Sequence, residues 1–199
     1  MRRIYPILAI MVLSVSVGCS SNIPIIENDE FEVASALGLP GILPGLDVYQ
    51  YADALATFTT EFDPNIKGRT HNIKRASTAI NFTVVQPGEE FSYNKTIGPT
   101  TKKNGYELGM VFMQGKKAQG YGGGVCQVSS TLYNAAANAG MEIVERHDHS
   151  LPVSYVPAGQ EAATSFGGKD FRFINTNNFP VVIRSVVGHG EITVSIHHV

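Results

Sequence analysis

The sequence has few cysteines, no tryptophan and no excess of charge of one sign. It contains two cysteines among 199 residues, and 15 basic and 17 acidic residues give a formal net charge of −2. Two cysteines are too few for a disulfide-rich scaffold or for a zinc site of four thiolates. Without a basic excess, nothing favours nucleic acid as a partner. The apolar fraction of 43% is nevertheless sufficient for the packed core of one domain.

The N-terminal apolar run is too short for a comfortable membrane span. It covers residues 4–17, whereas a span needs about 20 apolar residues. Because two arginines precede it, the run indicates a secretory signal peptide, which we place at residues 1–18. The apolar run ends in Ser-Val-Gly-Cys at residues 16–19, and a small residue directly before a cysteine there resembles a bacterial lipobox. Ser16 stands where Leu is more usual in that motif. We expect cleavage before Cys19 and a lipid such as palmitate on it, which anchors the protein outside the cytoplasm. The alternatives are an ordinary cleaved signal peptide and an uncleaved anchor.

The rest of the chain divides into a tether and one folded domain. Proline and glycine interrupt residues 19–50, which we interpret as a tether, and the domain is expected at 51–199. Apolar periodicity predicts a helix over 72–82 and a longer one from the Gly-rich loop to Gly140. Period-two patterns predict strands at 55–62, 84–85, 91–93, 143–144, 153–156, 171–174, 181–187 and 192–196, with a hairpin over 105–117. The pattern lacks βαβ alternation, which predicts an α+β fold: a central helix bearing Cys126, packed on a largely antiparallel sheet.

Cys126 is the residue whose position points most clearly to chemistry. It follows three glycines and falls near the first turn of the long predicted helix. Unbonded backbone N–H groups and the helix dipole favour a thiolate there and could stabilise an oxyanion. On a helical wheel the cysteine lies away from the apolar stripe, so it need not be buried. We expect a cysteine nucleophile; the alternative is a small, inert core residue.

A cysteine nucleophile needs a base, and the base needs a group that orients it. His149 and His147 follow the helix and would point to one side of an extended segment. Glu161 or Asp170 would then orient the imidazole. The order cysteine, histidine, acid is that of papain-like and transglutaminase-like enzymes. It favours a catalytic Cys-His-acid arrangement similar to theirs.

The same residues leave other interpretations open. A His-x-His pair can bind zinc, with Cys126, His71 or His189 as a third ligand, and both histidines can have purely structural hydrogen bonds. Our expectation is no metal and no cofactor. The glycines would let a peptide backbone approach closely. We expect substrate contacts from Gly122, Gly123, Gly124, Gln127, Ser129 and Tyr155.

Four blocks of the sequence together resemble the VanW family, named for an accessory protein of vancomycin-resistance gene clusters. They are residues 91–99 (FSYNKTIGP), 122–136 (GGGVCQVSSTLYNAA), 145–150 (ERHDHS) and 153–157 (VSYVP), within a resemblance from about Asn72 to Asn178. The resemblance implies an exported or membrane-attached bacterial protein linked to the cell envelope. The family usually has a Gly-x-Asp-Ala pattern where this chain has Glu161, which keeps the carboxylate but lengthens the side chain by one methylene.

Two functions from different classes are consistent with these residues. The leading hypothesis is an envelope lipoprotein in which Cys126 performs acyl transfer or amide hydrolysis on a cell-wall peptide. The rival is a non-catalytic module that binds peptidoglycan or a protein partner, with the glycine-rich loop, Tyr121, Tyr133 and Tyr155 forming its groove. Replacement of Cys126 separates the two hypotheses.

Overall fold

The computed structural model describes residues 54–113 and 115–199. The predicted signal peptide, Cys19 and the tether therefore lie outside the described residues. In chain order the described elements are β1 (Ala54–Glu61), α3 (Lys67–Ile80), β2 (Val84–Val85), β3 (Glu90–Ser92), α4 (Tyr93–Ile97), a 3-10 turn (Lys102–Asn104), β4 (Leu108–Met113), β5 (Lys116–Tyr121), α5 (Val125–Asn138), β6 (Glu142–Glu145), β7 (Arg172–Ile174), β8 (Val181–Gly188) and β9 (Glu191–His198).

The described strands form two sheets and a separate hairpin, and every pairing is antiparallel. The larger sheet has the order β1-β9-β8-β2, and the smaller has the order β3-β7-β6. Strands β4 and β5 pair with each other. His189 and Gly190 connect β8 to β9 with φ values of 53° and 84°, the conformation of a tight two-residue hairpin turn. The predicted α+β class with largely antiparallel sheets is confirmed.

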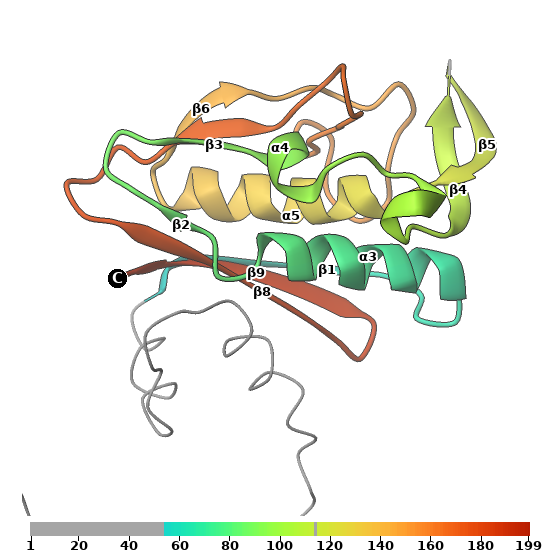
Figure 1. The fold of residues 1–199 in the computed structure, drawn as a ribbon, viewed down its shortest axis with the longest axis horizontal. Coiled ribbons are helices and arrows are strands. Elements are labelled where there is room, and N and C mark those ends of the chain that lie inside the picture. The colour runs from blue at the N-terminus through green and yellow to red at the C-terminus, as the bar shows by residue number, and fades with distance from the viewer. Residues whose placement is uncertain (1–53, 114) are drawn as a thin grey trace, which may run out of the picture. The chain divides into compact units, whose positions relative to one another are not determined.

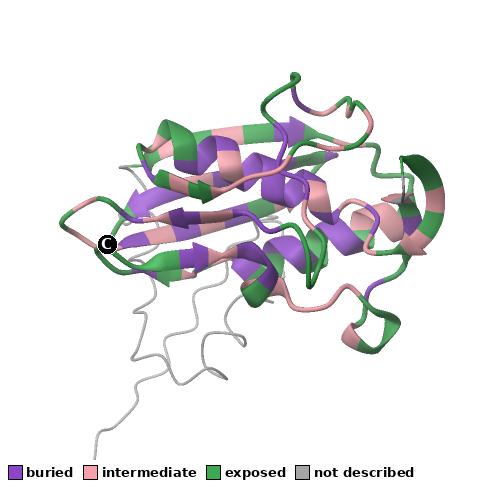
Figure 2. Cartoon of the chain, turned by 90° about the horizontal axis from the view of Figure 1, so that it is seen from above, coloured by how far each residue is buried: buried purple, intermediate pink, exposed green. Residues whose placement is uncertain are grey.

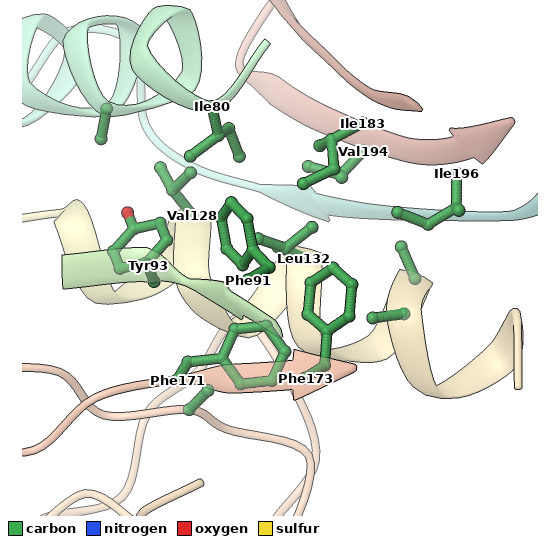
Figure 3. Packing of buried hydrophobic residues seen from close by; sticks show 14 of the residues in the cluster. Ile80, Phe91, Tyr93, Val128, Leu132, Phe171, Phe173, Ile183, Val194 and Ile196 are labelled. Carbon is green, nitrogen blue, oxygen red and sulfur yellow. The ribbon is translucent and has the colours of Figure 1, made fainter. Parts of the chain in front are cut away.

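Helix α5 lies between the two sheets, as Figure 1 shows. It packs on β1 and β9 of the larger sheet, while α3 packs on β8 and beside α5. Leu132 of α5 is fully buried, with phenylalanines of the smaller sheet on one side and aliphatic residues of the larger sheet on the other (Figure 3). Burying one such side chain stabilises the fold by about 1.5–3 kcal/mol. Figure 2 shows buried residues concentrated where helices and sheets meet.

Three local predictions differ from the structure. Helix α3 begins at Lys67, five residues before the predicted start at 72. Helix α4 was not predicted; the Lys95 backbone N–H donates to Ser92 Oγ at 3.1 Å, so a serine N-cap converts the end of β3 into a helix. Residues 153–156 do not form a strand. The flanking Pro152 and Pro157 lack N–H donors, and this segment has no partner in either sheet.

Candidate functional site

Cys126 is the second residue of α5 and is partly exposed. The helix begins after Gly124, whose φ of 106° is accessible to glycine without strain. The sulfur contacts Thr164: the Thr164 backbone N–H donates to Sγ at 3.5 Å, and the thiol donates to the Thr164 carbonyl at 3.4 Å. Within the described part of the chain, no hydrogen bond joins Sγ to an imidazole. The thiol therefore lies in polar surroundings, but not against a base.

Cys126 is also one member of a polar stripe along α5. Ser130 Oγ accepts from the Ala162 backbone N–H at 2.9 Å, and Asn134 Nδ2 donates to the Gln160 carbonyl at 2.8 Å. Four residues of helix rise about 6 Å, and two residues of extended chain span about 6.6 Å. Positions 126, 130 and 134 therefore match positions 164, 162 and 160 one for one. This match holds the segment 160–164 along the face of α5 that the helical wheel predicted to be polar.

Arg69 and Tyr155 are a charged and an aromatic group near the first turns of α5, where Arg69 donates to Gln127. Burial lowers the pKa of Arg69, while the nearby Tyr155 and Cys126 oppose that change. Burial, and then the proximity of Cys126, raise the pKa of Tyr155 far above its ordinary value, so its hydroxyl stays protonated at neutral pH. The Arg69 guanidinium carbon lies 5.9 Å from the centroid of the Tyr155 ring, within range of a cation–π interaction. A positive charge and a hydroxyl group therefore accompany the sulfur.

His149 and Glu161 line one wall of a small cavity of about 200 Å³. The His149 ring contacts Tyr155 edge-on, with 6.4 Å between centroids, and Phe112 of β4 at 5.9 Å. Burial lowers the pKa of His149, against the effect of the nearby Glu161 carboxylate, so the imidazole is neutral at pH 7. Its Nδ1 is buried with no hydrogen-bond partner among the described residues. Tyr155 is thus the residue that adjoins both the thiol and this imidazole.

His147 and Asp170 both contact Glu145 and are not part of the cavity that His149 and Glu161 line. His147 Nε2 lies 2.9 Å from Glu145 Oε1, and the Asp170 backbone N–H donates to that same oxygen at 2.8 Å. The hydrogen bond from His147 is the main reason why the pKa of Glu145 is lowered. The Asp170 carboxylate accepts from the Asn94 N–H at 2.8 Å and from Ser92 Oγ at 2.6 Å, at the start of α4. Of the two candidate pairs, His149 with Glu161 is the one that faces a cavity.

The three glycines before α5 pack against protein. A Cβ on Gly123 would lie 2.7 Å from the Met110 carbonyl oxygen, and one on Gly122 would lie 2.7 Å from the Thr100 side chain. A Cβ on Gly124 would lie 3.0 Å from side-chain atoms of Arg69. Close approach of β4 and α3 therefore accounts for the small residues here without a substrate.

Gln127 and Ser129 are both fully buried in α5. Gln127 Oε1 accepts from Arg69, and its Nε2 donates to Thr60 Oγ1 at 2.9 Å and to the Glu61 carbonyl at 2.8 Å. Ser129 Oγ donates to the Ala162 carbonyl at 2.6 Å. These hydrogen bonds connect α5 to α3, to β1 and to the 160–164 segment. Gln127 in this way holds the guanidinium that lies beside the thiol.

Tyr155 lines a second, larger cavity. With Ser154 and the end of β1 it lines an open cavity of about 540 Å³. The opposite wall is formed by Thr59, Thr60 and Glu61 of β1 and by Phe62 and Asp63, which follow it. Since Glu61 and Asp63 supply the charged groups, this wall is polar and acidic.

Two residues of the site had not been singled out from the sequence, Arg69 and Thr164. Arg69 precedes the buried Ile73 by one helical turn, so it lies on the inward face of α3. A charged residue on a buried helix face requires a polar or charged partner. The helical spacing of Arg69 and Ile73 was therefore the sequence signal that could have identified Arg69. Thr164 carried no comparable signal, because its contact with Cys126 spans 38 residues of intervening chain.

Among the described residues there is neither a group of metal ligands nor a membrane-spanning helix. In that part of the chain, no three histidine, cysteine or acidic side chains are grouped so that they could hold a metal ion. Helices long and apolar enough to cross a membrane are likewise absent from residues 54–113 and 115–199.

Comparison with known proteins gives a family match over most of the described domain. The family described as VanW like protein matches residues 68–197. YoaR of Bacillus subtilis (strain 168) is 38% identical over 165 residues, which are 78% of this chain and 54% of YoaR. The vancomycin B-type resistance protein VanW of Enterococcus faecalis (strain ATCC 700802 / V583) is 29% identical over 128 residues, 61% of this chain and 46% of that protein. The chain thus spans about half the length of these curated relatives, and no solved structure matches it.

Proposed function

Because the chain belongs to the family of VanW-like proteins, we propose that it is a cell-envelope protein whose Cys126 acts as a nucleophile on cell-wall peptides. The reaction would be acyl transfer or amide hydrolysis. The observation that carries the proposal is the placement of a partly exposed thiol in the first turn of α5, with the Arg69 guanidinium bonded to the adjacent residue Gln127. Nucleophilic cysteines are often placed at a helix N-terminus, close to a cation.

His149 is the base that this proposal assigns. Its imidazole is neutral at pH 7 and can accept a proton, its ring adjoins Tyr155, and the Glu161 carboxylate lies near enough to favour the protonated ring. His147 is bonded to Glu145 instead, and Asp170 caps α4. We therefore prefer His149 and Glu161 over His147 and Asp170 as the catalytic pair.

The proposed reaction has two steps. The thiol proton passes to His149 while sulfur bonds to the acyl carbon, and the C–N bond breaks as the proton moves to the departing amine. Water or a second amine then attacks the thioester, and the thiol is released. The first step requires His149 to reach the sulfur, which in this structure contacts Thr164.

The contact of Cys126 with Thr164 favours a second candidate function, a non-catalytic binding module. In that case the cysteine serves only to hold segment 160–164 on α5, as Ser130 and Asn134 do. The cavity lined by Glu161 and the cavity lined by Tyr155 would bind a cell-wall peptide or a protein partner without chemical change.

Mass spectrometry of the chain incubated with cell-wall stem peptides separates the two functions. The enzyme hypothesis predicts a thioester on Cys126 and release of an amine, both lost in Cys126→Ala. It also predicts slower adduct formation in His149→Gln than in the matched variant His147→Gln. Binding of the peptide with equal affinity by wild type and Cys126→Ala, and no adduct in either, would favour the binding module.

Attachment to the membrane through Cys19 is a separate proposal supported by the lipobox-like sequence before that residue. Labelling of bacteria with an alkyne analogue of palmitate should modify the wild-type chain and leave Cys19→Ala unlabelled. The variant Cys126→Ala is the matched control and should label normally. Labelling of Cys19→Ala at the wild-type level would exclude this anchor.

A further inference from the structure

The Glu161 carboxylate is buried without a cationic partner. Its residue is 8% exposed, and its only hydrogen bond among the described residues comes from the Gly159 backbone N–H, which donates to Oε2 at 2.6 Å. The Arg146 guanidinium donates to the Glu161 main-chain carbonyl at 2.7 Å, and its ion pair is with Asp148. Buried carboxylates are ordinarily paired, because removing an unpaired charge from water costs several kcal/mol.

The cavity beside this carboxylate has the Glu161 charge on one side and mostly apolar side chains around it. Its volume is about 200 Å³, and Leu151, Pro152, Val153, Val156 and Ala158 line it together with His149, Ser150 and Glu161. The neutral His149 ring does not compensate the carboxylate. Lys169, the other cation near this ring, donates from Nζ to the Asp148 carbonyl at 3.0 Å. The cavity therefore offers a negative charge to a ligand whose remaining surface is aliphatic.

We propose that this cavity binds an aliphatic primary ammonium group, whose charge pairs with Glu161 and whose short hydrocarbon stem packs between Val153 and Val156. An ammonium group can donate to the free oxygen Oε1 while Gly159 continues to donate to Oε2. The proposal rests on the proposed function only in taking this ammonium group to belong to the cell-wall substrate. The binding itself needs no reaction at Cys126.

Binding of n-butylammonium to the purified Cys126→Ala chain tests the proposal without catalysis. The probe is titrated at pH 7 and constant ionic strength, and the backbone amide signals of Val156 and Gly159 are followed by NMR. We expect saturable shifts with n-butylammonium and at least about tenfold weaker binding of n-butanol, which has the same stem without the charge. Equal binding of the two probes, or no saturable shift with n-butylammonium, would overturn the proposal.

Two variants locate the site. Glu161→Gln should weaken n-butylammonium binding about tenfold or more, whereas Glu142→Gln, an exposed carboxylate on β6, should leave it unchanged. Should Glu161→Gln lose its dispersed spectrum, Ala158→Trp serves instead: residue 158 is exposed and lines the cavity, so a large side chain there should block binding in a folded protein. Wild-type affinity in a folded Glu161→Gln, or in Ala158→Trp, contradicts the site. Both variants are made in the Cys126→Ala chain, so none of these binding measurements depends on the thiol. If they fail, the thioester experiment is still an independent test of the proposed function.

Discussion

Substitution of Ser130 by alanine tests whether the polar stripe of α5 holds the 160–164 segment. Ser130 Oγ accepts from the buried Ala162 N–H at 2.9 Å and donates to the Cys126 carbonyl at 2.7 Å. Removing the oxygen leaves the Ala162 N–H without an acceptor. One buried unsatisfied N–H costs about 1–3 kcal/mol, so we expect the free energy of unfolding to fall by that amount.

Urea unfolding followed by far-UV circular dichroism measures this change. Ser154→Ala is the matched control, because Ser154 is exposed and should change the stability by no more than about 0.5 kcal/mol. In hydrogen exchange, Ser130→Ala should also raise the exchange rate of the Ala162 amide more than that of amides in β8. A loss of stability below about 0.5 kcal/mol, with unchanged Ala162 exchange, would refute the account of the stripe.

Three further predictions concern the core, the glycine loop and pH. Leu132→Ala should lower the free energy of unfolding in urea by about 2–5 kcal/mol, because Leu132 is fully buried between the two sheets; the half-exposed Val186→Ala should change it little. Gly123→Ala should destabilise the protein by about 1–3 kcal/mol, since its Cβ would lie 2.7 Å from the Met110 carbonyl oxygen. Gly188→Ala is the control and should not destabilise it, because a Cβ at residue 188 has no other atom within 4 Å. Similar melting temperatures of the two variants would contradict the close packing at Gly123. The folded-state pKa of His149 is lowered from 6.5, so the unfolded chain binds this proton first and stability should fall as the pH drops below about 6.5. His149→Gln should flatten that part of the urea-midpoint profile, and a slope equal to that of His147→Gln would refute this origin.

Much of the fold could be predicted because its elements depend on local patterns. The stripe of Val128, Leu132 and Ala136 in α5 has helical spacing and is fully buried, as predicted. The hairpin β8-β9 follows from two alternating runs around Gly188-His189-Gly190. The strand predicted at 153–156 was wrong, because alternation alone does not supply a neighbouring strand.

The site was predicted less completely, since its geometry depends on contacts between distant segments. Cys126 and its place in the first turn of α5 were found from the sequence alone. The environment of His149, its cavity with Glu161, and the separation of His147 and Asp170 into another cluster were not. Both histidines lie in one short segment, so no local pattern distinguishes them.

By itself, the amino-acid sequence determined the α+β class, the family and the location of the single thiol of the described domain, because periodicity and motif spacing are local properties. Tertiary structure alone decided that the sulfur contacts Thr164, that Arg69 and Tyr155 lie beside it, and that the Glu161 carboxylate remains unpaired in a cavity. The physical reason is that the 160–164 segment folds over α5. Hydrogen bonds between side chains spaced four residues apart on the helix and alternate residues of an extended backbone determine which groups meet.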